Sequence, residues 1–394
     1  MVPHQILDSV YLAFLCDDMG MLRNDKDLTC VCIDSLCADS PFHDYFGPSN
    51  LKRAFDFCQM METQMLISKM PIILTVSADG KLITGAIFLI GAYMILKLEM
   101  DVDSFMHKID SFRETIMPFT DVLCGPRKSS FELDIKDCFQ ALFRAKSLNW
   151  VDFGPDGFDA DEYKQLDDPL NADMHEVVPG KLLILRGPRD LPNGAIWLDV
   201  KREDSRFSHR DFSPQHYAGI LQQFEVQVVV RCNAPQYDRR GFEDAGIAVV
   251  DLAYEDGGAP PVDVVAKFLA ISEAVPGAVA VHCASGLGRT GTLIALYTMK
   301  HHGFTAREAM GWLRIVRPGR FGPSLPSYIE SAALGIRPAW SIPSRLPLTQ
   351  TLSTAFRRLP VDSPCLEYHT VCNDDCLRLN DGSVPLTHRP PFPD

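Results

Sequence analysis

The sequence predicts an α/β protein that contains two domains of related architecture. The chain has 394 residues, of which 46% are hydrophobic, so it is too long for one compact domain and suits two domains with a tail. Residues 277–300 join a run of small and β-branched residues, a glycine-containing loop and an apolar stretch, which is typical of a buried strand, a loop and a helix. Residues 71–96 show the same order in the first half of the chain.

The loop after the second of these strands predicts an anion site. It lies within the segment 277–291, GAVAVHCASGLGRTG. Backbone N–H groups converge in such a loop, and the dipole of the following helix adds positive potential. Glycines permit backbone angles that a side chain would forbid. The amides expected to hold the anion are those of Ala284, Ser285, Gly286, Leu287, Gly288 and Arg289.

Two side chains in this loop predict catalysis rather than simple binding. The potential that holds a phosphate also lowers the pKa of a thiol, so Cys283 is expected to be a thiolate near neutral pH and a nucleophile directed at phosphorus. Arg289 can bind two phosphoryl oxygens and neutralise the charge of the transition state. His282 and Thr290 are expected to support the nucleophile, Thr290 by donating its hydroxyl to the sulfur. A structural cysteine beside a surface arginine is the alternative, but it leaves the glycines unexplained.

An acid is also needed to protonate the departing oxygen. Asp256 begins a loop rich in glycine and proline after a predicted strand, whereas Asp251 lies within that strand and Glu255 is adjacent. The residues alone leave these three carboxylates open, and Asp256 before two glycines also suits a simple turn.

The composition narrows the classes of partner. A net charge of −13 disfavours nucleic acid and acidic membranes and favours basic partners or substrates. The twelve cysteines are scattered and the chain does not open like a secretory signal, which predicts an intracellular protein of the cytoplasm or nucleus with reduced thiols. The apolar run 82–96 is shorter than the ~20 residues of a membrane span and predicts a core helix.

The remaining elements are predicted from hydrophobic periodicity and capping residues. In chain order they are a strand at 6–15, a helix capped by Ser49 or Asn50 and ending near 67, helices at 101–112 and 131–145, a strand at 181–186, a helix at 214–224, a strand at 226–232, a helix at 262–274, and a helix opened by the capping box of Thr305 and Glu308 and ending at Val316.

The predicted domain boundaries follow changes in composition. Residues 1–148 form the first domain, residues 149–176 an acidic linker broken by glycine and proline, and residues 177–335 the second domain. Residues 336–394 are rich in proline, serine and threonine and are predicted to be a disordered tail.

The first domain is predicted to repeat the cysteine segment without its chemistry. Residues 71–96 align with that segment without a gap, so that Ser77 falls on Cys283 and Ile83 on Arg289. The first domain therefore lacks the nucleophile and the arginine. A chance match between two ordinary strand–loop–helix units is the alternative.

Longer motifs identify a family resemblance. The runs HCASGLGRTGTLIA and MKHHGFTAREAMGWLRIVRPG, preceded in order by YFGPSNL, FLIGAY, FDADEY and VPGKL, cover about residues 5–335 and resemble the cell-division-cycle-14 dual-specificity phosphatases. The resemblance implies a tandem of two dual-specificity-phosphatase-like α/β domains of which only the C-terminal one is catalytic. It also implies Cys283 as nucleophile, Arg289 as phosphate clamp and Asp256 as general acid, with no metal and no cofactor.

The resemblance further implies a substrate class. The family dephosphorylates phosphoserine or phosphothreonine, preferably before proline and with a basic residue beyond, and phosphotyrosine, in cell-cycle control. Asp161 and Glu162 of the linker, and Asp79 of the first domain, are candidates for binding the basic residue. Two alternatives stay open: a weakly active or inactive module that binds phosphoproteins, and a phosphatase for a non-protein phosphate such as a lipid or an RNA end.

The sequence departs from the family pattern at several positions, including Lys164, which interrupts the acidic linker where the family is acidic. Ala284 stands where the family has lysine, which disfavours a phosphoinositide substrate. Ser324 and Leu325 replace glutamines, one of which positions the hydrolytic water, and Glu132 aligns with an aromatic residue of the proline pocket. The lost lysine and glutamine favour the binding-module alternative.

Overall fold

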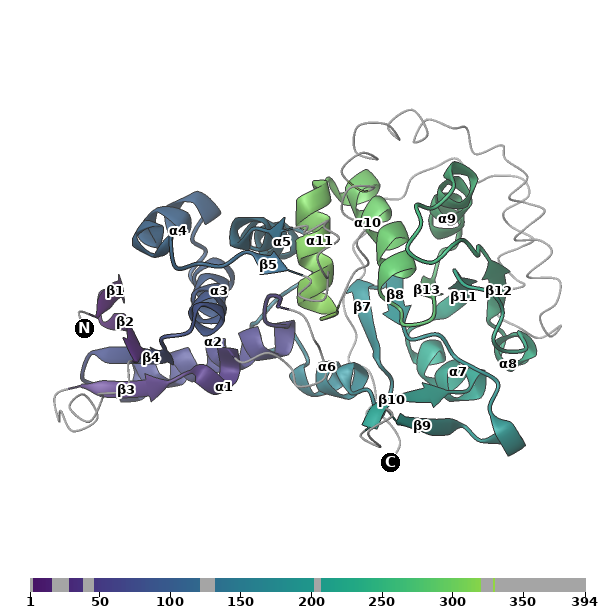
Figure 1. Ribbon diagram of the computed structural model, residues 1–394, viewed down its shortest axis with the longest axis horizontal. Coiled ribbons are helices and arrows are strands. Elements are labelled where there is room, and N and C mark those ends of the chain that lie inside the picture. The colour runs from purple at the N-terminus through teal and green to yellow at the C-terminus, as the bar shows by residue number, and fades with distance from the viewer. Residues whose placement is uncertain are drawn as a thin grey trace. The chain divides into compact units, whose positions relative to one another are not determined.

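The computed structural model describes residues 3–15, 28–37, 46–120, 132–201 and 207–319, together with Ile329. Contacts group the chain into two units, one formed by residues 1–160 and 298–330 and the other by residues 161–297 and 331–394. Each unit contains its own β-sheet and its own helices (Figure 1). The predicted tail and the positions of Ser324 and Leu325 lie outside the described residues.

The sheet of the first unit has the strand order β1-β2-β4-β3. Its strands are β1 (His4–Leu7), β2 (Val10–Leu15), β3 (Thr29–Cys32) and β4 (Ile72–Ser77). β4 runs parallel to β2 and β3, whereas β1 and β2 are antiparallel. The prediction of one strand over residues 6–15 is therefore wrong, because Asp8 and Ser9, both favourable in turns, fold it into a hairpin.

The apolar run of the first unit forms its central helix, as predicted. In α3 (Gly80–Leu96) every residue from Ile83 to Leu96 is buried. None of the helices in the described parts of the chain combines the length and hydrophobicity that a bilayer-spanning segment needs. The helices that accompany α3 in this unit are α1 (Asp34–Cys37), α2 (Leu51–Ile67), α4 (Val102–Lys108), the 3₁₀ turn η2 (Asp110–Phe112), α5 (Ile135–Ser147) and α11 (Ala306–Val316).

Capping side chains set the ends of several of these helices. Asn50 caps α2 by accepting from Arg53 N at 3.0 Å, which decides between the two predicted caps. Thr305 and Glu308 form the predicted capping box of α11. Asp134 caps α5, so this helix begins later than the predicted residue 131. The predicted helix 101–112 is divided into α4 and η2 at Ile109, which leaves helical geometry.

The sheet of the second unit has the order β12-β11-β13-β8-β7. All neighbouring pairs are parallel except β7 and β8. The strands are β7 (Met174–Val178), β8 (Leu182–Leu185), β11 (Val226–Arg231), β12 (Ala248–Asp251) and β13 (Ala278–His282). The helices are α6 (Ala160–Asp167), α7 (Pro214–Gln223), α8 (Arg240–Glu243), α9 (Val262–Ala274) and α10 (Gly288–His302).

The two sheets share a topology. In each, an antiparallel hairpin (β1–β2 or β7–β8) is followed by a parallel strand (β4 or β13) and then by a second parallel neighbour (β3 or β11). The strand that the sequence aligned with the cysteine strand, β4, occupies the matching place and leads into the matching helix, α3. The predicted α/β repeat is therefore present as a fold, which a chance match of two short segments would not produce.

The grouping of contacts differs from the predicted boundaries. Within the predicted linker 149–176, α6 and most of β7 are regular elements of the second unit. Conversely, α11 groups with the first unit because it packs on α5, where Arg307 Nε lies 2.8 Å from Asp137. The acidic segment thus contains regular secondary structure.

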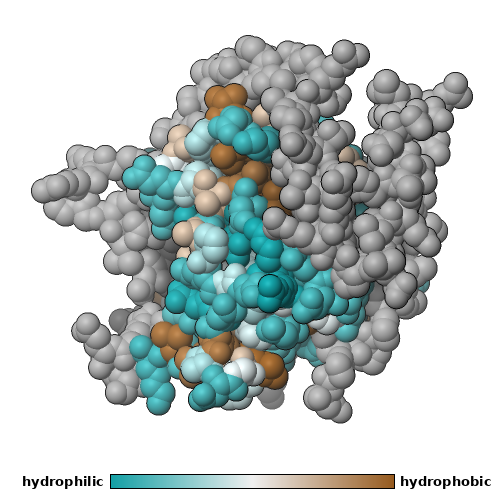
Figure 2. Space-filling view, turned by 90° about the vertical axis from the view of Figure 1, so that its right-hand side faces the viewer, coloured by the Kyte–Doolittle hydropathy of each residue, from teal (hydrophilic) through white to brown (hydrophobic). Residues whose placement is uncertain are grey.

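Among the described residues visible in Figure 2, the surface is mainly hydrophilic, and the hydrophobic colour is gathered in separate areas. The exposed apolar side chains of the second unit include three consecutive residues, Ile196, Trp197 and Leu198. They belong to, or directly precede, the two-stranded ribbon of β9 (Trp197–Lys201) and β10 (Phe207–Phe212). The Arg210 guanidinium covers the Trp197 ring at 3.8 Å.

Replacing Gly91 by alanine is expected to destabilise the first unit. A Cβ atom there would lie 2.3 Å from the Phe139 ring and 2.7 Å from the Phe105 ring, and overpacking of this kind costs about 1–3 kcal/mol. Gly219→Ala is the matched control, because this exposed position in α7 has nothing within 4 Å of the new atom. It should gain about 0.5–1 kcal/mol from helix propensity. Calorimetric unfolding of both variants checks this, and equal effects of the two would contradict the packing.

Candidate active site

The central strand β13 places Cys283 at the carboxyl edge of the second sheet. β13 lies between β8 and β11, and its pairing continues to His282, directly before the cysteine. Cys283 is only 2% exposed. The chain then turns through residues 284–287 into α10. Gly286 makes this turn possible, because its φ is +66° and a Cβ atom would lie 2.0 Å from the Leu185 carbonyl oxygen.

The surroundings of Cys283 favour its thiolate. Burial raises the pKa of this thiol, but the combined effect of the groups around the sulfur is larger and leaves the pKa below the ordinary value. These groups are the hydroxyl and amide of Thr290, the amide of Leu287 and the charge of Arg289. Two of these donors are amides at the start of α10, where the glycine loop predicts an anion site.

Arg289 is held inward at the edge of this loop. Its side chain is 10% exposed, and its Nη1 donates to the carbonyl oxygens of Tyr254 at 3.2 Å and Cys232 at 3.5 Å. The Tyr254 hydroxyl in turn donates to the Arg289 carbonyl at 2.7 Å. These contacts leave the guanidinium near the sulfur, where it could bind the oxygens of a phosphoryl group.

Asp256 is the predicted acid that contacts the arginine. Its Oδ1 lies 3.1 Å from Arg289 Nε, and its side chain is 79% exposed. Asp251, which the sequence left open, binds Arg231 Nε at 2.6 Å and Arg239 Nη2 at 2.5 Å. The carboxylate of Asp251 is thus engaged in a separate network, and the structure brings Asp256 and Arg289 together.

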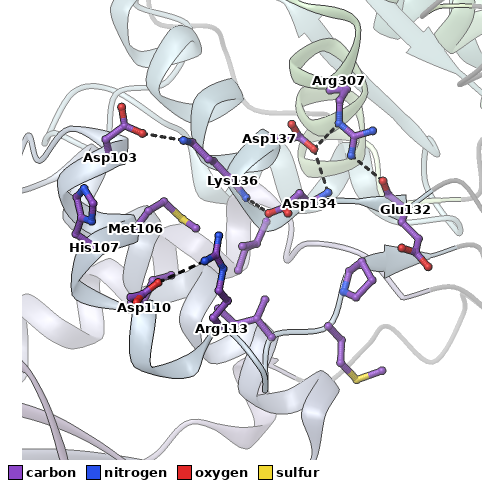
Figure 3. Close-up of a pocket in the computed structure, with 15 residues that line it drawn as sticks. Asp103, Met106, His107, Asp110, Arg113, Glu132, Asp134, Lys136, Asp137 and Arg307 are labelled. Carbon is purple, nitrogen blue, oxygen red and sulfur yellow. Dashed lines mark hydrogen bonds and ion pairs between the residues drawn. The ribbon is translucent and has the colours of Figure 1, made fainter.

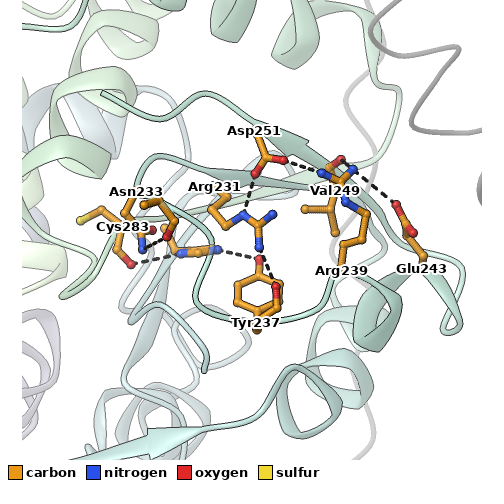
Figure 4. A network of polar contacts seen from close by, with 10 residues as sticks. Arg231, Asn233, Tyr237, Arg239, Glu243, Val249, Asp251 and Cys283 are labelled. Atoms are coloured by element: carbon orange, nitrogen blue, oxygen red, sulfur yellow. Dashed lines mark hydrogen bonds and ion pairs between the residues drawn. The ribbon is translucent and has the colours of Figure 1, made fainter. Parts of the chain in front are cut away.

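A network of polar contacts includes the backbone of the nucleophile, Cys283 (Figure 4). His282 Nδ1 lies 3.1 Å from the Cys283 carbonyl oxygen, and its Nε2 lies 2.8 Å from the Tyr237 hydroxyl. Burial lowers the pKa of His282 to about 4, so the ring is neutral near pH 7. Because a carbonyl only accepts, Nδ1 carries the proton and Nε2 accepts from Tyr237.

Charged groups hold Tyr237 in turn. Arg231 Nη1 donates to the Tyr237 carbonyl at 2.9 Å, and its guanidinium lies 4.6 Å from the centre of the Tyr237 ring. Asp251 joins Arg231 to Arg239, and Arg239 Nη1 lies 3.7 Å from Glu243. This chain of contacts runs from α8 to the cysteine loop and fixes the His282 tautomer.

The carbonyl contacts also set the direction of the loop amides. His282 binds the Cys283 carbonyl, and Gly187 N donates to the Ala284 carbonyl at 3.1 Å. In a trans peptide the N–H points away from the preceding carbonyl, and the described residues contain no cis peptide bond. The N–H groups of Ala284 and Ser285 therefore point away from the carbonyls of Cys283 and Ala284, into the loop, which is the direction that binding of a phosphate by the loop requires. Gly187 cannot be larger, because a Cβ atom would meet the Cys283 carbonyl oxygen at 2.0 Å.

Sequence reasoning missed Tyr237, Gly187, Tyr254 and Arg231. Tyr237 and Arg231 precede the cysteine by more than forty positions and carry no local pattern. Gly187 follows the buried strand β8 by two residues. A glycine in such a place often permits close approach of another backbone segment, so it is the one of these residues that the sequence could have indicated.

The corresponding loop of the first unit is filled by carboxylates of the chain. Ser77, which aligns with Cys283, binds Asp34 through its amide at 2.8 Å and its hydroxyl at 2.5 Å. Asp79 accepts from the amides of Lys81 and Leu82 at the start of α3. Both acceptors occupy positions that an anion would need. Asp79 therefore serves as a helix cap, while Asp161 and Glu162 lie in the first turn of α6 in the second unit.

A separate cavity of about 810 Å³ lies in the first unit (Figure 3). Its charged lining residues include opposite pairs, such as Lys136 with Asp103 at 2.8 Å and Arg307 with Asp137 at 2.8 Å. Glu132, the residue aligned with the family's aromatic, also lines it. None of the predicted catalytic residues is among its lining residues. Within the described parts of the chain, no group of three His, Cys, Asp or Glu residues is arranged to hold a metal ion.

Comparison with known proteins agrees with the two-domain fold. Residues 5–145 match the family described as the N-terminal half of dual specificity protein phosphatases, and residues 213–328 match the dual specificity phosphatase catalytic domain. The chain is 32% identical over 323 residues to the tyrosine-protein phosphatase cdc-14 of Caenorhabditis elegans, covering 78% of this chain and 43% of the relative. It is 34% identical over 291 residues to the dual specificity protein phosphatase CDC14A of Mus musculus, covering 73% of this chain and 46% of the relative.

These two family matches, to the N-terminal half and to the catalytic domain, place the chain in the class of dual-specificity phosphatases. Within that class the chain belongs to the CDC14 family. It spans somewhat less than half the length of each of these two relatives.

Replacing Tyr237 by phenylalanine is expected to raise the pKa of Cys283. The change removes the donor that fixes His282, and loss of one partner of a buried hydrogen bond costs about 1–3 kcal/mol. The acid limb of the pH profile of kcat/KM on an aryl phosphate should move to higher pH. Tyr217→Phe is the matched control, because it removes another buried hydroxyl of the same unit, bound to the Ala172 carbonyl at 2.7 Å. An unchanged acid limb in Tyr237→Phe would contradict the positioning role.

Proposed function

We propose that the chain is a cysteine-dependent protein phosphatase that hydrolyses phosphate esters through a phosphocysteine intermediate. The observation that carries this proposal is the buried thiol of Cys283, whose pKa is lowered by surrounding donors and Arg289 in spite of burial. A thiolate in the loop before α10 suits attack on a bound phosphoryl group.

In the first step the Cys283 sulfur attacks phosphorus, and the bond from phosphorus to the leaving oxygen breaks. The loop amides and Arg289 bind the equatorial oxygens and stabilise the charge on them. Asp256, in its protonated form, gives its proton to the seryl, threonyl or tyrosyl oxygen. The 3.1 Å contact between Asp256 and Arg289 supports this role, because it holds the carboxylate beside the group that would bind the phosphoryl oxygens.

In the second step water attacks phosphorus, Asp256 accepts a proton from this water, and the sulfur leaves as a thiolate. The Thr290 hydroxyl, which helps to lower the pKa of Cys283, would stabilise this leaving group. The step uses no metal and no cofactor. The family glutamine that positions the water is replaced by Ser324 or Leu325, so hydrolysis is proposed to be slower than the first step.

The proposed substrates are phosphoproteins that carry basic residues near the phosphorylated serine, threonine or tyrosine, in the setting of cell-cycle control. The net charge of −13 supports a basic partner. Asp161 is exposed and Glu162 is half-buried on α6, and these two residues are the better candidates to bind the basic residue. Asp79 is also exposed, but its carboxylate is engaged as a cap. A location in the cytoplasm or nucleus stays a prediction from the sequence.

Replacing Cys283 by serine is expected to abolish turnover and to retain phosphate binding, because the amides and Arg289 remain. Turnover is measured on a Ser-Pro phosphopeptide with a following lysine, on the same peptide with alanine at that position, on an RNA 5′-phosphate and on an inositol phospholipid. Calorimetric titration of the serine variant with the lysine peptide measures binding. Residual turnover in this variant would reject the nucleophile, and faster wild-type turnover of RNA or lipid would reject the protein substrate.

Replacing Asp256 by asparagine is expected to lower kcat about a hundredfold or more on an alkyl phosphate, since general acid catalysis contributes roughly 10²–10⁴. The effect should be much smaller on p-nitrophenyl phosphate, whose leaving group needs no proton. Glu255→Gln is the matched control at the adjacent carboxylate that the sequence left open. A larger loss in Glu255→Gln than in Asp256→Asn would reassign the acid.

A further inference from the structure

A second cysteine lies beside the nucleophile and has no part in the proposed reaction. Cys232 directly follows β11, as Cys283 directly follows β13. The two strands are parallel neighbours in which Arg231 pairs with His282. The ladder continues one step, because Cys232 N donates to the His282 carbonyl at 2.8 Å. The two cysteines are therefore opposite each other at the ends of adjacent strands.

This register suits a covalent bond between the two side chains. Adjacent strands lie about 4.7–4.9 Å apart, and residues paired in a parallel ladder direct their side chains to the same face. Disulfides span Cα separations of roughly 4.4–6.8 Å, so the register alone brings the pair into range. Both residues are buried, Cys232 completely.

The charge of Cys283 also acts on the neighbouring Cys232. Burial raises the pKa of Cys232 well above the ordinary value, and the neighbouring Cys283 charge raises it further, while Arg289 opposes both. Burial and the charges of both cysteines also raise the pKa of the Tyr254 phenol. While Cys283 is a thiolate, Cys232 is thus kept as an unreactive thiol. Once the charge on Cys283 is lost, one cause of that suppression disappears.

We infer that Cys232 is a resolving cysteine, which forms an intramolecular disulfide with Cys283 after peroxide has oxidised the nucleophile. The Cys283 thiolate attacks a peroxide oxygen, the O–O bond breaks, and Cys283 becomes a neutral sulfenic acid while hydroxide departs. The Cys232 sulfur then attacks the Cys283 sulfur. The S–S bond forms, the S–O bond breaks, and the leaving hydroxide takes the Cys232 proton to form water.

The disulfide would protect the nucleophile from irreversible loss. A sulfenic acid without a partner is oxidised onward to sulfinic and sulfonic acids, which thiol reductants do not reverse. A disulfide is reversed by a dithiol. The loop would therefore respond to a peroxide by switching off and would recover on reduction.

Peptide mapping of the full chain tests this inference without relying on turnover. The protein is treated with hydrogen peroxide, its remaining thiols are alkylated, and it is digested with trypsin under non-reducing conditions. The expected product links residues 232–239 to residues 268–289, the tryptic peptides that contain the two cysteines. Absence of this linked pair, with Cys283 found instead as sulfinic or sulfonic acid, would overturn the inference.

Recovery after reduction gives a second readout. Wild type is expected to regain most of its own untreated activity with dithiothreitol, whereas Cys232→Ser should regain several-fold less and show the over-oxidised 268–289 peptide. Cys58→Ser, at a fully buried cysteine of α2, is the matched control and should recover like wild type. Equal recovery of Cys232→Ser and wild type would overturn the protective role. If the chain has no phosphatase activity at all, the linked peptide still decides the inference.

Discussion

The surroundings that favour a negative charge on the buried Cys283 are the constraint on which the proposed site depends. Burial alone would keep this thiol protonated, as it does for Cys37 and Cys58, whose pKa values burial raises to about 12. At Cys283 the same penalty is outweighed by the donors of the loop and the start of α10, together with Arg289. The difference between these cysteines lies in the number of donors directed at the sulfur, not in the degree of burial.

That direction is imposed by residues outside the loop. His282 and Gly187 bind the outward carbonyls of residues 283 and 284, which turns the following amides inward. Tyr237 fixes the tautomer of His282, and Arg231 fixes Tyr237. The first unit keeps the same strand, loop and helix but lacks the arginine, and Asp34 binds the loop there. The repeated fold thus supplies only a scaffold, and the chemistry depends on a small number of side chains around it.

The sequence predicted those helices, strands and caps that are determined by residues close together in the chain. The strand before Cys283, the core helix α3, the amphipathic helix α9 and the capping box of α11 follow from periodicity and from residues within one helical turn. The hairpin at Asp8 and Ser9 was missed because a short turn within an apolar run gives little periodic signal.

Contacts between residues far apart in the chain could not be predicted from periodicity and capping residues. The sequence singled out Cys283, Arg289 and Asp256, and the structure brings them together. The pairing of Tyr237 with His282 depends on the turn between β11 and α8, which has no sequence pattern. The helix α6 within the acidic stretch was not predicted, since charge on one face of a helix resembles charge on an unstructured segment.

The ionisation of Cys283 is measured most directly by the pH dependence of its alkylation by iodoacetate, followed on the 268–289 tryptic peptide, with Cys283→Ser as the blank. The thiolate account predicts a midpoint well below the roughly 8.5 of an ordinary thiol, and protection by inorganic phosphate. A midpoint above that value, without protection by phosphate, would contradict it.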